Sequence, residues 1–379
     1  MKIIVLGAGL IGAPIAVDLT KDSRFDVSIA DLNEQALSKL DQNRSVKCIQ
    51  IDLSKPKVVS TLVKDFDMVV NAVPGFMGYQ SLKSIIEAER DVVDIAFFPE
   101  DPYSLDELAK EKGVRVVVDC GVAPGMSNIL VGYVNSILDK TEKVLIYVGG
   151  LPEIRELPYE YKAPFSPIDV IEEYTRPARY IENGQLVVLP ALSEPELINF
   201  DDIGTLEVFN TDGLRTLART IDAPNMKEKT LRYPGHIEKM RLLRDSGFFS
   251  ADQIDINGNK IRPIDLTSKL LFPLWKYAKG EADLTVMQVM VEGVKEGKKI
   301  RYKYDLLDLY DANTETLSMA RTTGYTATMT VRLLAKGLYS YAGISPPEYI
   351  GRKPECVEFI LNGLEERGVV YTEIIEDIL

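Results

Sequence analysis

Short apolar runs alternate with amphipathic stretches through the first 120 residues of the chain. Several runs are continuously apolar and bounded by turn residues, which is typical of strands buried on both faces of a parallel sheet. The stretches between them space their apolar residues as a helix does, as in Leu10, Ile15 and Leu19. We therefore predict six strands separated by helices, over Lys2–Leu6, Val27–Asp31, Lys47–Ile51, Met68–Ala72, Val92–Ile95 and Val114–Asp119.

Strand–helix alternation at this spacing predicts an α/β fold with a doubly wound parallel sheet. Ligands of such sheets lie beyond the carboxyl ends of the strands. The residues that end the predicted strands are therefore candidate ligand contacts. They are Gly7, Asp31, Asp52, Asn71, Ala72, Val73, Pro74, Asp94 and Asp119.

The first predicted strand runs directly into the sequence Gly-Ala-Gly-Leu-Ile-Gly. Gly7 permits a tight turn, Gly9 lets a pyrophosphate approach the backbone, and Gly12 lets the next helix pack closely on the sheet. The N-terminus of that helix directs free N–H groups and a positive dipole end at the phosphates. The motif predicts a Rossmann-type dinucleotide site contacted by Gly7, Gly9, Leu10, Ile11 and Gly12.

Asp31 lies nineteen residues after Gly12, at the end of the second predicted strand. A carboxylate there accepts hydrogen bonds from the adenosine ribose hydroxyls. It would repel a 2′-phosphate, and the next three residues, Leu32–Glu34, include no Arg or Lys to receive one. The cofactor is therefore predicted to be NAD rather than NADP. The alternatives are an unoccupied remnant of a nucleotide fold and a signal-peptide core, which three glycines in register argue against.

The pattern changes after Cys120. A Pro-Gly turn, a helix through Ile137 capped by Ser127 or Asn128, and a strand over Lys143–Val148 come next. Asn183-Gly184 predicts a hairpin, and Pro263 can begin a helix that runs through Tyr277. Later strands are expected over Leu284–Glu292, Lys299–Leu306 and Leu317–Met319, and later helices near Thr323–Ala335 and Cys356–Arg367.

We expect two domains in this chain of 379 residues. Residues 1–125 and 322–379 are predicted to form the nucleotide-binding domain, with the last two helices returning to it by analogy with two-domain dehydrogenases. Residues 126–321 are predicted to form an α+β domain on an antiparallel or mixed sheet, for substrate binding and dimerisation.

Composition narrows the classes of partner. The net charge is −13, with Lys and Arg scattered along the chain, so neither nucleic acid nor an anionic membrane is an expected partner. No apolar stretch reaches the roughly 20 residues that span a bilayer. Three widely spaced cysteines show no metal or disulfide pattern, and His236 is the one histidine, so no metal site is expected. With no targeting signal, the expected location is the cytoplasm.

The segment Lys229–His236 is the most unusual motif outside the glycine-rich one. Arg232 ends a predicted strand, and the guanidinium fork can bind a carboxylate through two parallel bonds. After a Pro-Gly turn, His236 opens a helix, whose dipole would lower the imidazole pKa and keep a neutral base. The alternative is that Arg232 pairs with a surface acid and His236 caps the helix.

Further candidates lie near predicted turns and helix starts. Arg321 precedes a predicted helix with threonines in its first turn, which suggests either an anion site or an ordinary threonine cap. Thr211 and Asp212 are polar candidates for substrate binding, although a structural turn also explains them. Asp119 could face the nicotinamide or hold the Pro124-Gly125 turn.

Taken together, these motifs resemble the saccharopine dehydrogenase-like superfamily. The resemblance rests on Gly7–Gly12, Asp119–Asn128 and Thr230–Gly235, and it covers nearly the whole chain. Within the superfamily, Tyr147–Gly150, Arg232–Lys239 and Ala320–Tyr325 are similar to NAD-dependent L-lysine 6-dehydrogenases. Saccharopine dehydrogenases usually have Asp where this chain has Ala123, and an aromatic residue where it has His236.

The resemblance implies oxidative deamination of the lysine side-chain amine. NAD would take a hydride from Cε, and the product would be 2-aminoadipate 6-semialdehyde, which cyclises to piperideine-6-carboxylate, with release of ammonia. His236 is the expected base, with Asp94 or Asp119 in reserve. Arg232 is expected to clamp the substrate carboxylate with help from Arg321, and the resemblance implies a homodimer.

Two other functions fit the same sequence. A saccharopine dehydrogenase (L-glutamate-forming) would need a second cationic clamp, which Arg155, Arg176 and Arg179 could supply. A non-catalytic NAD-binding sensor or scaffold would bind the cofactor without turning over any amine.

Overall fold

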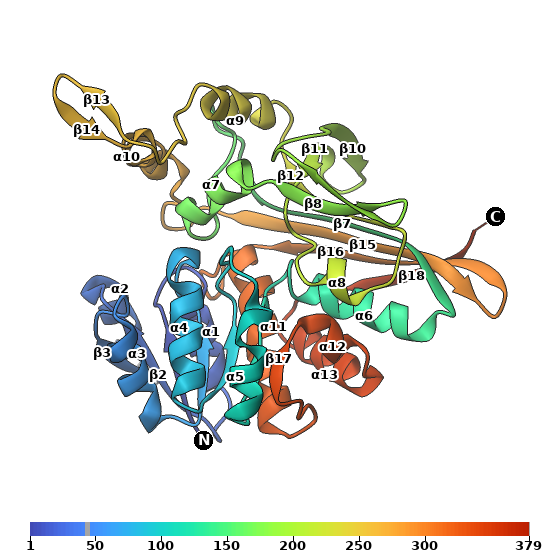
Figure 1. The fold of residues 1–379 in the computed structure, drawn as a ribbon, viewed down its shortest axis with the longest axis horizontal. Helices are drawn as coiled ribbons and strands as arrows, with labels where there is room; N and C mark the ends of the chain where they lie inside the picture. Colours follow the sequence, from blue (N-terminus) through green and yellow to red (C-terminus); the bar gives the residue numbers. More distant parts are fainter. Residues whose placement is uncertain (42–45, 379) are drawn as a thin grey trace. The chain divides into compact units, whose positions relative to one another are not determined.

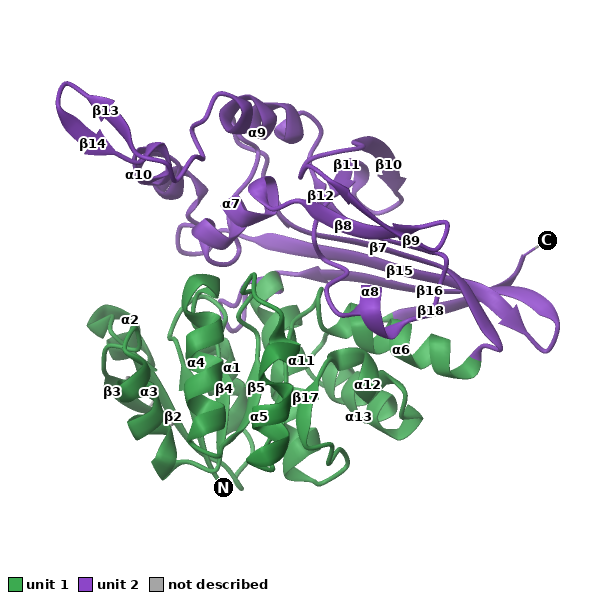
Figure 2. Ribbon diagram, in the orientation of Figure 1, with its two compact units in different colours: residues 1–137, 319–371 green, residues 138–318, 372–379 purple. Residues whose placement is uncertain are grey.

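The chain is described here by a computed structural model that covers residues 1–41 and 46–378. It divides into two compact units, shown in Figure 2. Unit 1 comprises Met1–Ile137 and Met319–Tyr371, and unit 2 comprises Leu138–Ser318 and Thr372–Leu379.

Unit 1 is built on a parallel sheet with helices between its strands (Figure 1). Among the described residues the strand order is β17-β6-β5-β4-β1-β2-β3, and all neighbours are parallel. The strands are β1 (Lys2–Leu6), β2 (Asp26–Asp31), β3 (Lys47–Gln50), β4 (Met68–Asn71), β5 (Asp91–Asp94), β6 (Arg115–Val117) and β17 (Gly343–Ser345). The six strands expected from the apolar runs are therefore confirmed, and the order reverses between β1 and β4, beside the glycine-rich turn.

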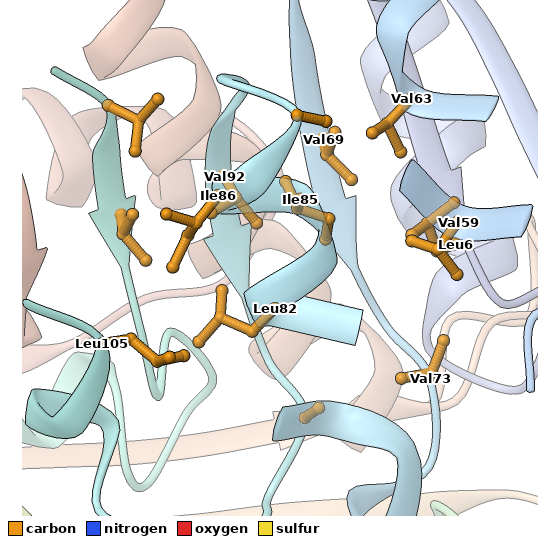
Figure 3. Packing of buried hydrophobic residues seen from close by; sticks show 14 of the residues in the cluster. Leu6, Val59, Val63, Val69, Val73, Leu82, Ile85, Ile86, Val92 and Leu105 are labelled. Atoms are coloured by element: carbon orange, nitrogen blue, oxygen red, sulfur yellow. The ribbon is translucent and has the colours of Figure 1, made fainter. Parts of the chain in front are cut away.

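The helices of unit 1 follow the apolar spacing seen in the sequence. Val59, Leu82 and Ala109, from three different helices, pack in one cluster with Ile4 and Leu6 of β1, and Figure 3 shows part of it. Ile3 and Val5 alternate with them and face the opposite side of the sheet. The helices are α1 (Gly12–Thr20), α2 (Glu34–Asp41), α3 (Pro56–Leu62), α4 (Gly75–Glu87), α5 (Asp106–Glu111), α6 (Met126–Ile137), α11 (Ser318–Ala335), α12 (Pro347–Gly351) and α13 (Pro354–Glu365).

One prediction in this region was wrong and one strand was missed. Leu317–Met319 is not a strand, because Ser318 is the first residue of helix α11 and its backbone N–H donates to Asp283 Oδ1 at 2.6 Å. That carboxylate satisfies a helix-start donor that would otherwise lack an acceptor. The missed strand, β17, is only three residues long, too short for a visible period.

Unit 2 contains a mixed sheet. Its strands are β7 (Lys140–Pro152), β8 (Ala178–Glu182), β9 (Gln185–Leu189), β10 (Glu196–Phe200), β11 (Gly204–Asn210), β12 (Asn225–Arg232), β15 (Asp283–Lys295), β16 (Lys298–Leu309) and β18 (Thr372–Asp377). The described order is β10-β11-β12-β7-β15-β16-β18, in which β12 and β7 are parallel and the other neighbours antiparallel. The predicted hairpin joins β8 to β9, and Asn183 and Gly184 have φ of 50° and 76°, as such a turn needs.

The other elements found among the described residues of unit 2 are four helices and a small hairpin. They are α7 (Pro167–Thr175), α8 (Leu217–Thr220), α9 (His236–Asp245), α10 (Pro263–Trp275), β13 (Ile254–Ile256) and β14 (Asn259–Ile261). None of the described helices combines the length and the apolar content that crossing a membrane would require.

The division into units differs in two places from the expected domains. Helix α6 belongs to unit 1, where it packs closely on α12: a Cβ on Gly132 would lie 2.3 Å from the Glu348 carbonyl oxygen. The second difference is strand β18, which pairs with β16 and belongs to unit 2, whereas α11 and α13 lie in unit 1.

Candidate functional site

The glycine-rich turn of unit 1 follows β1. Gly7 has φ of 103°, and a Cβ there would lie 2.5 Å from the Ala72 carbonyl oxygen. A Cβ on Gly12 would lie 2.0 Å from the Gly7 carbonyl oxygen. A Cβ on Gly9, in contrast, would have no atom within 4 Å. Gly7 and Gly12 are thus required by the fold itself, while the space beside Gly9 is left open, as a pyrophosphate requires.

Helix α1 starts directly after Ile11 and has no acidic residue in its first turn. The Ala13 and Ile15 amides donate to the Gly9 and Ile11 carbonyls at 3.2 Å, and Pro14 has no amide hydrogen. Leu10, beside the helix start, is exposed. The helix start therefore offers the Gly12 amide and a positive dipole end to an anion.

The far end of α1 is fixed by a buried ion cluster. Asp18 accepts from Arg332 at 2.7 Å, from Thr328 at 2.7 Å and from Arg367 at 2.9 Å. Burial alone would raise the pKa of Asp18, but these partners together lower it below the usual range. The helix that presents the glycine-rich turn is thereby tied to α11 and to the end of α13.

Asp31 ends β2 and is partly exposed. Its Oδ2 accepts from the Ala8 amide at 2.6 Å and its Oδ1 from the Asn33 amide at 2.7 Å. Each oxygen keeps a second lone pair for a ribose hydroxyl. The turn, the helix end and this carboxylate together fit a nicotinamide dinucleotide.

Asn71 and Asp94 end neighbouring strands and are fully buried. Asn71 Nδ2 donates to Asp94 Oδ2 at 2.6 Å, and Asp94 Oδ1 accepts from the Ala96 amide at 2.9 Å. Asn71 Oδ1 has no partner among the described residues. A buried acceptor of this kind calls for a donor, such as a ligand hydroxyl or a water molecule.

The other residues predicted at strand ends have local roles. The Ala72 amide donates to the Leu6 carbonyl at 2.9 Å, and Val73 and Pro74 lead into α4. Asp52 accepts from Ser54, which is the main reason that its pKa is lowered, and it also pairs with Lys55 at 3.3 Å.

Asp119 is buried, has φ of 51°, and precedes a tight turn in which the Gly121 amide donates to the Pro124 carbonyl. The start of α11 packs beside this turn, since a Cβ on Gly121 would lie 3.3 Å from Thr323 Cγ2. Arg321 was predicted to help bind an anion at a helix start. Its Nη2 instead donates to the Arg367 carbonyl at 3.0 Å, just after the end of α13.

In unit 2, Arg232 and His236 are joined through Tyr174, a residue of α7. Arg232 Nε donates to the Tyr174 hydroxyl at 3.1 Å, and that hydroxyl lies 2.9 Å from His236 Nε2. His236 Nδ1 lies 3.0 Å from the Tyr159 carbonyl, which can only accept. Nδ1 therefore carries the proton, and the Tyr174 hydroxyl must donate to Nε2.

This chain of bonds fixes the state of His236. Its side chain is 1% exposed and both ring nitrogens are bonded within the protein. Burial is the main cause that lowers the pKa of His236, to about 3, and the charge of Arg232 adds to it. The imidazole is neutral, as expected at this helix start, but burial rather than the helix dipole is the main reason. Its nitrogens hold Tyr174 and Tyr159 instead of facing a substrate.

The Arg232 guanidinium is also committed inside unit 2. Nη2 donates to Glu173 Oε2 at 2.7 Å, and the group lies over the Tyr161 ring at 4.5 Å from the centroid. Burial raises the pKa of Glu173, and Arg232 opposes that rise. The guanidinium therefore cannot offer two free parallel N–H bonds to a substrate carboxylate, which is the contact expected from the sequence.

Two hydrogen-bond donors near Arg232 have no partner among the described residues. They are Nε1 of Trp275, which is fully buried, and the buried hydroxyl of Tyr277. Trp275 contacts the Tyr161 ring, with centroids 5.5 Å apart, and Tyr161 in turn contacts Arg232. An unsatisfied buried donor costs about 1–3 kcal/mol, so an acceptor is expected at these groups.

Thr211 and Asp212 form separate contacts. The Thr211 hydroxyl donates to Glu228 and lies 2.9 Å from the Thr230 hydroxyl, and Asp212 forms a two-pronged ion pair with Arg179 at 2.7 Å. Burial raises the pKa of Glu228 to about 8, with the Thr211 bond acting against the rise.

We expect Glu228→Gln to stabilise the protein above pH 8 and to leave stability nearly unchanged at pH 4.5. The folded pKa lies above the ordinary value of 4.5, so the folded state holds a proton that the unfolded state releases. The contribution of Glu228 to wild-type stability therefore falls as pH rises from about 4.5 to about 8, by on the order of a few kcal/mol. Melting temperatures of both proteins across this range measure the difference, and a difference that does not change with pH would rule out a buried titrating Glu228.

Sequence reasoning missed Glu173, Tyr174, Trp275, Tyr277 and Glu228. Four of them lie on, or just after, amphipathic helices far from the Arg232 motif in sequence, where they look like ordinary surface or core residues. Glu228 alone carried a signal, because it lies on the same face of β12 as Thr230 and Arg232.

Two matches to known protein families together cover almost all of the chain. Residues 3–117 match the saccharopine dehydrogenase NADP binding domain, and residues 121–369 match the saccharopine dehydrogenase C-terminal domain. Carboxyaminopropylagmatine dehydrogenase of Synechocystis is 22% identical over 399 residues, covering 99% of this chain and 98% of that protein.

The mitochondrial alpha-aminoadipic semialdehyde synthase of Mus musculus is 23% identical over 62% of this chain, which spans 27% of that protein. The chain likewise spans 29% of the corresponding bovine protein. Among solved structures, the apo saccharopine dehydrogenase (L-Glu forming) of Saccharomyces cerevisiae has a TM-score of 0.79 at 19% identity, with 99% of each chain covered. At that identity the likeness shows a shared fold.

Proposed function

This chain belongs to the saccharopine dehydrogenase family, and on that premise we propose that it is a nicotinamide-dependent dehydrogenase that oxidises the amine-bearing carbon of an amino-acid substrate. The single observation that carries the proposal is the glycine-rich turn of unit 1. There the space beside Gly9 is open and Asp31 is partly exposed at the end of the next strand. When bound, the nicotinamide supplies the hydride acceptor.

We propose NAD as the cofactor. The matching family domain is described as NADP binding, whereas the local charges of this chain favour NAD. A 2′-phosphate would meet the Asp31 carboxylate, and Lys55, near the end of β3, is paired with Asp52. Arg44 lies outside the described residues.

We expect Asp31→Ser to raise the preference for NADP over NAD at least tenfold. The change removes both the repulsion of a 2′-phosphate and the acceptor for the ribose hydroxyls, and hydrogen bonds to a charged group contribute about 1.5–3 kcal/mol. Dissociation constants of both reduced cofactors measure the ratio. Asp26→Ser, at the opposite end of β2, is the matched control and should leave it unchanged; an unchanged ratio in Asp31→Ser would refute the assignment.

Lysine is the proposed substrate, with its ε-amine oxidised and ammonia released. The support is the resemblance of the Arg232–Lys239 and Ala320–Tyr325 segments to lysine 6-dehydrogenases. Saccharopine is the second candidate, favoured by the family match itself.

Residue roles follow from the bonding. His236 is proposed as a positioning residue that holds Tyr174, since both its nitrogens are in use. An ammonium cannot release hydride, so a base must first take its proton. We propose Asp94 or Asp119 as this base. Asp94 is the last residue of β5, and Asp119 lies two residues after the end of the neighbouring strand β6, in the sheet that carries the glycine-rich turn.

One assay distinguishes these functions. The purified protein is incubated with NAD or NADP and with lysine or saccharopine, and reduced cofactor and ammonia are measured together. Lysine oxidation gives both in equal amounts, whereas saccharopine oxidation gives reduced cofactor without ammonia. Cofactor binding without turnover of either amine would contradict the proposal and indicate a sensor. Asp94→Asn and Asp119→Asn in the same assay identify the base, because the variant that lacks the base must lose nearly all turnover.

A further inference from the structure

The chain contains three Asn-Gly pairs, at residues 183–184, 257–258 and 362–363. In such a pair the asparagine loses ammonia spontaneously, because glycine has no Cβ to obstruct its own backbone nitrogen. That nitrogen attacks Cγ of the asparagine, a C–N bond forms and ammonia leaves, which closes a cyclic imide. Water then opens the ring to aspartate or isoaspartate, so water is the one other reactant.

The three pairs differ in how firmly the structure holds them. Ring closure requires the asparagine backbone to rotate into a conformation that neither a helix nor a two-residue hairpin turn has. The surrounding element must therefore open first, and different elements of one protein open with very different free energies. The sequence alone predicts equal reactivity at the three pairs, whereas the structure predicts an order.

Asn362 and Gly363 lie within helix α13. A Cβ on Gly363 would lie 2.1 Å from Met329 Cε, so this part of the helix packs closely on its neighbour. Gly363 and Leu364 are buried, and Nη1 of Arg367 donates to the Gly363 carbonyl at 2.7 Å. Freeing this pair requires a packed helix to unfold.

Asn183 and Gly184 form the turn of the β8–β9 hairpin, which has five residues in each strand. Ile181 of this hairpin also pairs with β12. The Asn183 amide donates to Asn225 Oδ1 at 3.1 Å, and the Gly184 amide donates to the Pro224 carbonyl at 2.8 Å. The attacking nitrogen of this pair is thus tied to the start of β12.

The third pair forms the turn of the β13–β14 hairpin, which Figure 2 shows reaching beyond α10. The hairpin has three residues in each strand, and no third strand pairs with it among the described residues. Ile254 and Ile256 are each 45% exposed, and the Gly258 amide donates to Asp255 Oδ1, within the hairpin itself, at 2.9 Å. A two-stranded sheet this small is at best marginally stable in water, so it opens readily.

We propose that Asn257 is a site of spontaneous deamidation in the folded protein, and that Asn183 and Asn362 are protected by the elements that hold them. The product carries one more negative charge than asparagine does. Isoaspartate at residue 257 also adds a methylene group to the backbone, so the two-residue turn cannot form again and the pairing of β13 with β14 is lost.

Mass spectrometry of peptides from the aged protein tests this order. The folded protein is kept in mildly alkaline buffer, and conversion at the three sites is followed with time. Asn257 is expected to convert at least about tenfold faster than Asn183 or Asn362, because local opening ranges from nearly free to as costly as global unfolding. In guanidinium chloride the three sites are expected to convert at similar rates, since glycine follows each of them.

Two variants provide matched controls. Asn225→Ala removes the acceptor of the Asn183 amide, so conversion at residue 183 should accelerate roughly two- to tenfold while residue 257 is unaffected. Asn257→Gln should abolish conversion at residue 257 and leave the other two sites unchanged, because the longer side chain closes its ring far more slowly. Far-ultraviolet circular dichroism should show both variants folded.

Three results would overturn the proposal. They are equal rates at the three sites in the folded protein, no conversion at Asn257, and the same order of rates in the unfolded chain, which would trace the preference to sequence alone.

Discussion

Gly9→Ala is expected to fold as the wild type does while binding NADH about 100-fold more weakly. A Cβ at residue 9 would have no atom of the protein within 4 Å, so the folded chain accepts a methyl group there. The same methyl group would stand where the backbone must meet the pyrophosphate, and a displacement of about 1 Å in a binding site can cost roughly 10²-fold. Calorimetric titration with NADH and thermal unfolding without cofactor measure the two effects separately.

Gly12→Ala is the contrast that makes this prediction specific. Its Cβ would lie 2.0 Å from the Gly7 carbonyl oxygen, so the backbone of the turn must shift. This variant should lose melting temperature even without cofactor, whereas Gly9→Ala should not. If Gly9→Ala bound NADH as the wild type does, the open space beside Gly9 would not be the pyrophosphate site.

Arg232→Met is expected to destabilise the protein by about 3–5 kcal/mol. The change leaves the Glu173 carboxylate, whose side chain is 20% exposed, without its cation, and breaking a largely buried pair from one side costs about this much. It also removes the donor to Tyr174, which in turn orients His236. Urea unfolding of the variant and the wild type gives the difference in unfolding free energy.

A double variant separates the ion pair from simple packing. In Arg232→Met with Glu173→Gln no buried charge is left alone, so part of the lost stability should return. Lys47→Met, which removes an exposed pair with Asp26, is the control and should change stability little. A double variant no more stable than Arg232→Met would show that the ion pair is not what the single change disrupts.

The sequence predicted unit 1 well for a physical reason. Strands buried on both faces are continuous apolar runs, and the glycine-rich turn depends on backbone contacts that only glycine allows. Both features can therefore be recognised from a short stretch of sequence. Gly7 and Gly12 are confirmed as positions where a Cβ would collide with backbone oxygens. The three-residue β17 has no recognisable sequence pattern, because it becomes a strand only by pairing with β6.

The polar residues of unit 2 were harder to interpret, because their meaning depends on distant partners. Arg232 and His236 were identified as unusual, but their roles follow from Glu173 and Tyr174, some 60 residues earlier. The same holds for Arg321 of unit 1, which looked like part of an anion site at a helix start, yet its guanidinium donates to the Arg367 carbonyl. Asp212 likewise meets Arg179 across unit 2. The sequence around a charged residue does not show which distant charged group the tertiary fold will place beside it.

The most direct test of the whole account is a calorimetric titration of the intact wild-type protein with NADH, and in parallel with NADPH. The account predicts saturable binding of NADH at one site per chain, at least tenfold tighter than that of NADPH. If neither reduced cofactor gave measurable heat or any other sign of binding, the glycine-rich turn would hold no nicotinamide dinucleotide, and the proposed dehydrogenase function would be contradicted.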